Sequence, residues 1–273
     1  MVIVVINNKG GTGKTTTCVN LSAALANLGY RVLLVDLDPQ ASASLSLGVD
    51  YSNLSPSSGE VLLEGYSIEK AIRKTNINCL DLLTGGIELA HSDLVLSDIE
   101  DRENKLTEVL EPIKDRYDYI LCDCAPALSL LQVNALIAGD HFIIPVVPEY
   151  LALEGLVNLM DVVERFKTGM GVDIDLLGII INKLNSTPFV FLNRELRNQL
   201  DIVNLLREHY GDKVLKTTIK RNVQLTEAPS YNQSIFQYAP KSNAAQQYSQ
   251  LAEEILMRCN GFNGSNQGLN QMM

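Results

Sequence analysis

The sequence contains no tryptophan, and only five cysteines are spread over its 273 residues. Their odd number and irregular spacing argue against a disulfide framework. Cys122 and Cys124 form a C-x-C pair without a second pair, so the usual zinc-binding spacing is missing. No charge-free apolar run reaches the roughly 18 residues that a membrane-spanning helix needs, and the first residues lack the basic start of a secretory signal. We therefore expect a soluble cytoplasmic protein that does not bind a membrane.

Basic residues are also scarce, with 22 Lys and Arg against 32 Asp and Glu and a net charge of −10. This balance argues against nucleic-acid binding by the whole surface. The basic residues gather late in the chain: residues 183–222 carry 8 basic and 4 acidic residues, whereas residues 1–182 carry 12 and 25. Any contact with nucleic acid is therefore expected from the late segment.

A glycine-rich turn joins the apolar run 2–6 to a helical pattern that extends to about Asn27. A strand, a glycine turn and a helix in this order form a cradle for phosphate, because backbone N–H groups and the helix N-terminus face the anion. The turn differs from the standard P-loop by having Asn8 where that pattern has glycine, and by a second lysine before the glycine pair. The predicted cofactor-binding residues in it are Lys9, Gly10, Gly11, Thr12, Gly13, Lys14, Thr15 and Thr16.

Two further apolar runs, 31–36 and 117–123, each end in an acid. Runs that are apolar throughout are typical of strands buried on both faces of a parallel sheet. With the helical patterns between them, they predict an α/β fold, a single-domain, mostly parallel twisted sheet flanked by helices, of the P-loop NTPase type. We place the domain at residues 1–258, and we expect the polar tail 259–273 to be disordered because it is rich in Gly, Asn, Ser and Gln.

The acids at these strand ends are candidates for metal and water chemistry. Asp36 and Asp38 are separated by one residue beside the phosphate loop, and Asp123 ends the later strand. An apolar strand that ends in Asp is the usual second acid of nucleoside triphosphatases, where it holds Mg²⁺ directly or through water. These acids and the phosphate loop therefore predict a nucleoside triphosphate bound together with Mg²⁺.

Three motifs together carry a resemblance to a known family. The stretch from Lys9 to Thr16, the stretch 34–40 (Leu-Val-Asp-Leu-Asp-Pro-Gln) and the stretch 119–126 resemble the deviant Walker A loop, switch I and Walker B/switch II of the ParA/Soj partition ATPases, which are related to MinD. The stretches 149–156 and 222–230 resemble segments seen mainly in ParA and Soj. The resemblance covers roughly residues 1–258.

The resemblance implies an ATPase that works as an ATP-dependent homodimer. Lys9, Lys14 and Asp38 would be catalytic: Lys14 on its own ATP, Lys9 on the ATP of the partner copy, and Asp38 on the attacking water. Thr15, Asp36 and Asp123 would form the metal region. These roles are consistent with the chemistry of phosphoryl transfer, which depends on positioning of the reactants and on positive charge near the phosphates.

The resemblance also implies a base pocket at Asn182 and Asn222, non-specific DNA binding by the ATP dimer, and a centromere-binding ParB-like partner that stimulates hydrolysis. The protein would then be cytoplasmic and associated with the nucleoid. The chain departs from the family pattern at Lys220, where we expect proline. The candidate DNA contacts are the basic residues Arg194, Arg197, Lys216, Lys220 and Arg221.

Two alternatives stay open at this point. A positioning ATPase of the same family could serve another cargo or the division site, as MinD does. A dinucleotide-binding oxidoreductase would also begin with a strand, a glycine turn and a helix, although this turn lacks the third glycine of that fingerprint.

Overall fold

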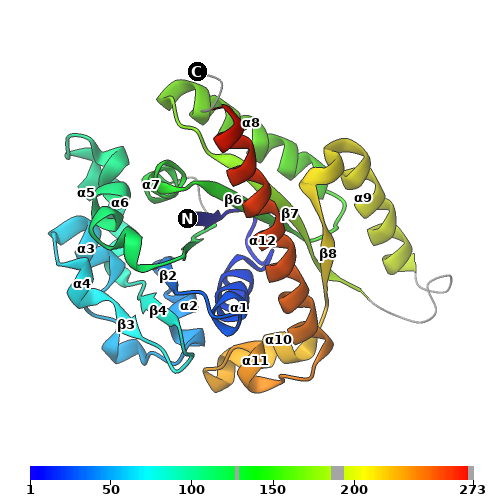
Figure 1. Cartoon of the computed structure of the whole chain (residues 1–273), viewed down its shortest axis with the longest axis horizontal. Coiled ribbons are helices and arrows are strands. Elements are labelled where there is room, and N and C mark those ends of the chain that lie inside the picture. The colour runs from blue at the N-terminus through cyan, green and yellow to red at the C-terminus, as the bar shows by residue number, and fades with distance from the viewer. Residues whose placement is uncertain (127–128, 186–193, 270–273) are drawn as a thin grey trace.

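The computed structural model describes residues 1–126, 129–185 and 194–269, with side chains as far as Gly261. Within these residues, eight strands form one sheet in the order β3-β4-β2-β5-β1-β6-β7-β8 (Figure 1). The strands are β1 (Val2–Val5), β2 (Val32–Leu37), β3 (Arg73–Lys74), β4 (Leu80–Leu83), β5 (Tyr119–Cys124), β6 (His141–Val146), β7 (Asp175–Leu184) and β8 (Val214–Lys220). The short edge strand β3 pairs antiparallel with β4, and the other pairings are parallel. The predicted mostly parallel sheet is confirmed.

The central strands are apolar throughout because helices cover both faces of the sheet. In β1, Val2 and Val4 belong to one core cluster, and Ile3 and Val5 belong to the other. Successive side chains of a strand point to opposite faces, so one continuous apolar run fills two cores.

The helices divide between the two faces. One core cluster takes side chains from α1, α2, α11 and α12, and the other takes them from helices α3 to α9. In Figure 1, α1 and α12 lie side by side over the same face of the sheet. The helices are α1 (Lys14–Asn27), α2 (Ser42–Ser46), α3 (Ser58–Glu64), α4 (Ile68–Ala71), α5 (Ser92–Ser97), α6 (Lys105–Leu110), α7 (Leu130–Ala138), α8 (Ala152–Met170), α9 (Arg194–Tyr210), α10 (Val223–Glu227), α11 (Ile235–Tyr238) and α12 (Asn243–Leu269).

The last helix bears on the predicted end of the domain. α12 continues to Leu269, and Cys259 is fully buried in the core. The boundary at 258 and the disorder of 259–273 stay predictions. All five cysteines are free, as expected. Across the described ranges, no helix is both long enough and apolar enough to cross a membrane.

The order of the strands decides where a ligand can bind. β1 lies between β5 and β6, and β5 lies between β1 and β2. Because these strands are parallel, the segments that follow β1, β2 and β5 leave the sheet at the same edge. Ligands of open α/β sheets bind at this carboxyl edge.

Candidate functional site

The phosphate loop after β1 has the backbone of an anion cradle. Gly11 and Gly13 have φ values of +74° and +92°, in the region that disfavours residues with a Cβ atom. A Cβ atom on Gly13 would also lie 2.2 Å from Nδ2 of Asn182. Within the described residues, the N–H groups of Gly10, Gly11 and Gly13 donate to no protein acceptor. The loop therefore keeps donors available at the N-terminus of α1, where an anion is stabilised.

Lys14 lies inside this cradle. Its side chain is buried, and its Nζ lies 3.4 Å from the carbonyl oxygen of Lys9. Burial lowers the pKa of Lys14, whereas the carboxylate of Asp123 acts in the opposite direction. A cation that is held in place but poorly compensated is suited to binding phosphate oxygens.

The two acids at the strand ends are neighbours. Asp36 and Asp123 are register partners on β2 and β5, and neither side chain is exposed. Burial raises the pKa of Asp36 to about 6 and that of Asp123 to about 8, and the charge of Asp36 adds to the increase at Asp123. Two neighbouring carboxylates that are both buried favour a bound proton on one of them.

The two acids differ in their hydrogen bonds. Both oxygens of Asp36 are satisfied: Oδ2 accepts from the N–H of Ser44 at 2.9 Å and from its hydroxyl at 2.7 Å, and Oδ1 accepts from the N–H of Asp38 at 3.1 Å. Neither oxygen of Asp123 has a partner of good hydrogen-bond geometry among the described residues. Asp36 therefore supports the turn after β2, and Asp123 is the acid with free acceptors.

The residues around Asp123 fit a magnesium ion. A buried carboxylate with unpaired oxygens is costly unless a cation or a donor meets it. The Thr15 hydroxyl lies beside this carboxylate and lowers its pKa, against the larger effect of burial. In the part of the chain that the structure describes, no group of three or more His, Cys, Asp or Glu side chains is arranged to hold a metal ion by itself. That agrees with Mg²⁺, which keeps waters and takes substrate phosphates as ligands.

The side chains of Asp38 and Lys9 are both accessible to solvent. Asp38 is partly exposed, and its Oδ1 accepts from the N–H of Gln40 at 2.9 Å. Lys9 is exposed and forms an ion pair with Glu149, on the loop after β6. Of the two loop lysines, only Lys14 is directed into its own cradle.

The predicted base-binding residues lie at one pocket of about 340 Å³, which Thr16, Asn182 and Asn222 line. Nδ2 of Asn182 donates to the carbonyl of Thr12 at 2.9 Å, and this joins β7 to the phosphate loop. Asn222 caps α10 by accepting from the N–H of Gln224 at 2.7 Å. The structure therefore brings these residues together beside the loop, and their contact with a base stays a prediction.

The basic candidates for DNA contact lie on two elements. Arg194 and Arg197 are exposed on α9, and Lys216 and Lys220 are exposed on β8. Arg221 and Lys220 also line the pocket of about 340 Å³. These two are thus exposed and also border the predicted base pocket.

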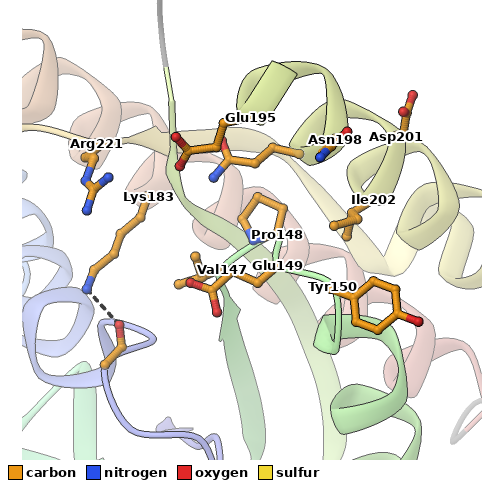
Figure 2. A pocket seen from close by; sticks show the side chains of 12 residues that line it. Val147, Pro148, Glu149, Tyr150, Lys183, Glu195, Asn198, Asp201, Ile202 and Arg221 are labelled. Carbon is orange, nitrogen blue, oxygen red and sulfur yellow. Dashed lines mark hydrogen bonds between the residues drawn. The ribbon is translucent and has the colours of Figure 1, made fainter. Parts of the chain in front are cut away.

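A larger pocket of about 660 Å³ lies next to the phosphate loop, between the loop after β6 and the start of α9 (Figure 2). Lys183 and Glu149 both line it, and the Nζ of Lys183 donates to the carbonyl of Gly11 at 2.7 Å.

The sequence reasoning assigned no role to Ser44, Glu149 or Lys183. Two signals were visible in the chain: Glu149 opens a family-like stretch, and Lys183 directly follows Asn182. Neither signal identifies the contact partner.

The chain is similar to several known proteins. Residues 1–176 match a family model described as an AAA domain. The sporulation initiation inhibitor protein Soj of Bacillus subtilis is 38% identical over 254 residues, which cover 93% of this chain and 97% of that protein. The chromosome partitioning protein ParA of Myxococcus xanthus is 35% identical over 257 residues, which cover 94% and 88%.

Solved structures show the same architecture. Cobyrinic acid a,c-diamide synthase from Mycobacterium smegmatis, with bound ADP and magnesium, has a TM-score of 0.81 at 30% identity, covering 95% of each chain. The septum site-determining protein MinD of Pyrococcus horikoshii, in complex with Mg-ADP, has a TM-score of 0.72 at 29% identity, covering 93% of this chain and 95% of that one.

Proposed function

Since this chain belongs to the ParA/Soj family of ATPases, which use ATP and Mg²⁺, we propose that it segregates DNA as an ATP-dependent homodimer. The observation that carries the proposal is the contrast between its two loop lysines. Lys14 is buried in its own cradle, whereas Lys9 is exposed and turned outward to Glu149. A lysine on the outside of the loop can serve a second copy, as a cation supplied in trans does in other phosphoryl transfers.

The proposed chemistry divides among residues of the carboxyl edge. The N–H groups of residues 10–13 and the ammonium of Lys14 bind the phosphates, and Thr15 and Asp123 hold Mg²⁺. When bound, Mg²⁺ neutralises charge that develops on the phosphates. Asp38 orients the attacking water, and its partial exposure at the end of β2 gives the water access. Asp36 acts less directly, because its oxygens are occupied by Ser44 and by the N–H of Asp38.

Two asparagines and a set of basic residues extend this site. Asn182 and Asn222 border the pocket that would hold the base. For DNA, we propose phosphate contacts by the exposed cations, which would make binding non-specific and sensitive to salt. These cations are Arg194, Arg197, Lys216, Lys220 and Arg221.

The proposed cycle needs two partners besides ATP. The dimer would bind DNA in the cytoplasm, on the nucleoid, and a ParB-like centromere-binding protein would stimulate hydrolysis and release the dimer. The name of the ParA relative from Myxococcus xanthus, a chromosome partitioning protein, supports DNA partition as the process.

A positioning ATPase for the division site or another cargo is the second candidate, favoured by the similarity to MinD. The dinucleotide-binding oxidoreductase is set aside, because the chain belongs to a family of ATPases.

The deciding experiment compares DNA with membrane as the surface that the ATP form binds. The protein with ATP, ADP or no nucleotide is tested by gel shift on random-sequence DNA and by sedimentation with anionic liposomes. We expect a gel shift only with ATP, weakened by salt, and no sedimentation with liposomes. ATP-dependent liposome binding without a gel shift would favour the second candidate and refute the first.

A further inference from the structure

We propose that Lys183 is a positioning residue for the phosphate loop: with Asn182, it holds two consecutive loop carbonyls and fixes the loop in its anion-binding shape before nucleotide arrives. The proposal rests on the proposed role of the loop in ATP binding. It concerns how the empty loop is held, which neither DNA binding nor dimerisation tests.

The contacts form a clamp from the end of β7 onto the loop. Nζ of Lys183 donates to the carbonyl of Gly11 at 2.7 Å, which Figure 2 shows as a dashed line. Nδ2 of Asn182 donates to the carbonyl of the next residue, Thr12, at 2.9 Å. The N–H of Lys183 in turn donates to Oδ1 of Asn182 at 2.9 Å and fixes the orientation of that amide.

Holding these two carbonyls also orients two N–H groups. In a trans peptide, the carbonyl of one residue and the N–H of the next point in opposite directions. With the carbonyls of Gly11 and Thr12 turned toward β7, the N–H groups of Thr12 and Gly13 are turned away from it. Successive N–H groups directed away from the protein acceptors form the concavity that binds an anion.

The backbone of Lys183 supports a specific role for this residue. Its φ is +54°, in the left-handed region that residues with a Cβ atom rarely adopt. Such a conformation persists where the surroundings impose it. Glycine would adopt it without strain but has no side chain, whereas lysine brings a long stem and three donors. The strained position is thus occupied by a residue that can reach the loop.

The surroundings of Lys183 separate this role from packing. The residue is exposed, and it lines both the pocket of about 340 Å³ beside Asn222 and the pocket of about 660 Å³ beside Glu149. Its side chain fills no part of the core, so its removal should leave the fold intact.

The test uses three variants of the full-length protein and one control. Lys183→Met keeps the strained backbone and the stem but loses the donor. Lys183→Gly relieves the strain and also loses the donor, and Lys183→Arg keeps a donor. Lys114→Met, at an exposed lysine in the segment Glu111–Arg116, is the matched control.

Two readouts are compared: hydrogen exchange of the nucleotide-free loop peptide 7–15, and the affinity and kinetics with Mg-ATP. In Lys183→Met we expect faster exchange in the loop and about a tenfold rise in Kd and KM, with kcat within about twofold, because the loop must be ordered when ATP binds. Lys183→Gly should show the same loss of affinity together with a higher Tm, and Lys183→Arg should recover most of the affinity. The control should match the wild type.

Loop exchange and ATP affinity equal to the wild type in both the Met and the Gly variants would overturn the proposal. So would a loss confined to kcat. This test can be told apart from the test of DNA segregation. If the proposal about Lys183 is wrong, the protein can still bind DNA with ATP. If the protein binds no DNA, Lys183 can still hold the phosphate loop.

Discussion

Asp123→Asn should make the nucleotide-free protein more resistant to unfolding at neutral and alkaline pH. The carboxylate is completely buried, its oxygens have no partner of good geometry among the described residues, and its register partner is another buried acid. The substitution keeps the size and shape of the side chain and removes the charge. The amide still lacks partners, but it no longer has to be ionised in a buried site.

The magnitude follows from the pKa of Asp123, which burial and the charge of Asp36 raise from 3.8 to about 8. A carboxyl whose pKa is higher in the folded state stabilises the fold fully below its unfolded pKa. That stability is lost as the pH rises from about 4 to about 8. Each pH unit inside this window is worth about 1.4 kcal/mol for one group. Between pH 5 and pH 7, Asp123 alone should therefore remove roughly 3 kcal/mol from the free energy of unfolding.

The assay is urea unfolding without Mg²⁺ or nucleotide at pH 5, 6, 7 and 8. Circular dichroism is the probe, since the chain has no tryptophan for fluorescence. We expect the free energy of unfolding of Asp123→Asn to fall less with pH than that of the wild type, so that the two curves diverge as the pH rises. The exposed Asp115→Asn serves as the control and should run parallel to the wild type. Parallel curves for Asp123→Asn as well would refute the reasoning, because they would mean that Asp123 is not held protonated by its surroundings. The same variant should lose the Mg²⁺ dependence of ATP binding.

The remaining predictions concern the loop and the turn after β2. Lys14→Ala should abolish detectable nucleotide binding by calorimetry, and tight binding in this variant would contradict its place in the cradle. Asp38→Ala should bind ATP and accumulate as a slowly hydrolysing dimer on a sizing column, whereas a monomer with ATP would count against its role. Gly13→Ala should lose nucleotide binding and lower the Tm, because the added methyl group meets Asn182 and φ is +92°. Ser44→Ala removes a hydroxyl donor from buried Asp36 and should cost about 1–3 kcal/mol of unfolding free energy by urea titration; an unchanged midpoint would show that the bond contributes nothing.

The parts of the site that the sequence predicted are those with local signals. The glycine loop is recognisable by its composition, and the acids are recognisable by their position at the end of apolar runs. Because the strands of a parallel sheet end at the same edge, these residues come together there. The parts that it did not predict are pairs between distant segments. Lys9 and Glu149 are 140 residues apart, and Gly11 and Lys183 are 172 apart. Their meeting depends on the order of the strands, which places β6 and β7 on one side of β1. No spacing rule in the sequence encodes that order.

The two lysines of the loop show why such pairs matter to function. Moving the Lys14 side chain out of its site would cost free energy, since it is buried and positioned by the loop. Lys9 and Glu149 have side chains that are 56% and 55% exposed. An ion pair this exposed contributes at most about 1 kcal/mol, because water and salt screen it. If Lys9 left Glu149 and contacted the phosphates of a nucleotide bound to a second copy, the lost ion pair would therefore cost little free energy. The greater negative charge of a triphosphate favours this exchange. The same loop can thus carry Lys14, which stays with the nucleotide of its own subunit, and Lys9, which can turn to the nucleotide of a second subunit.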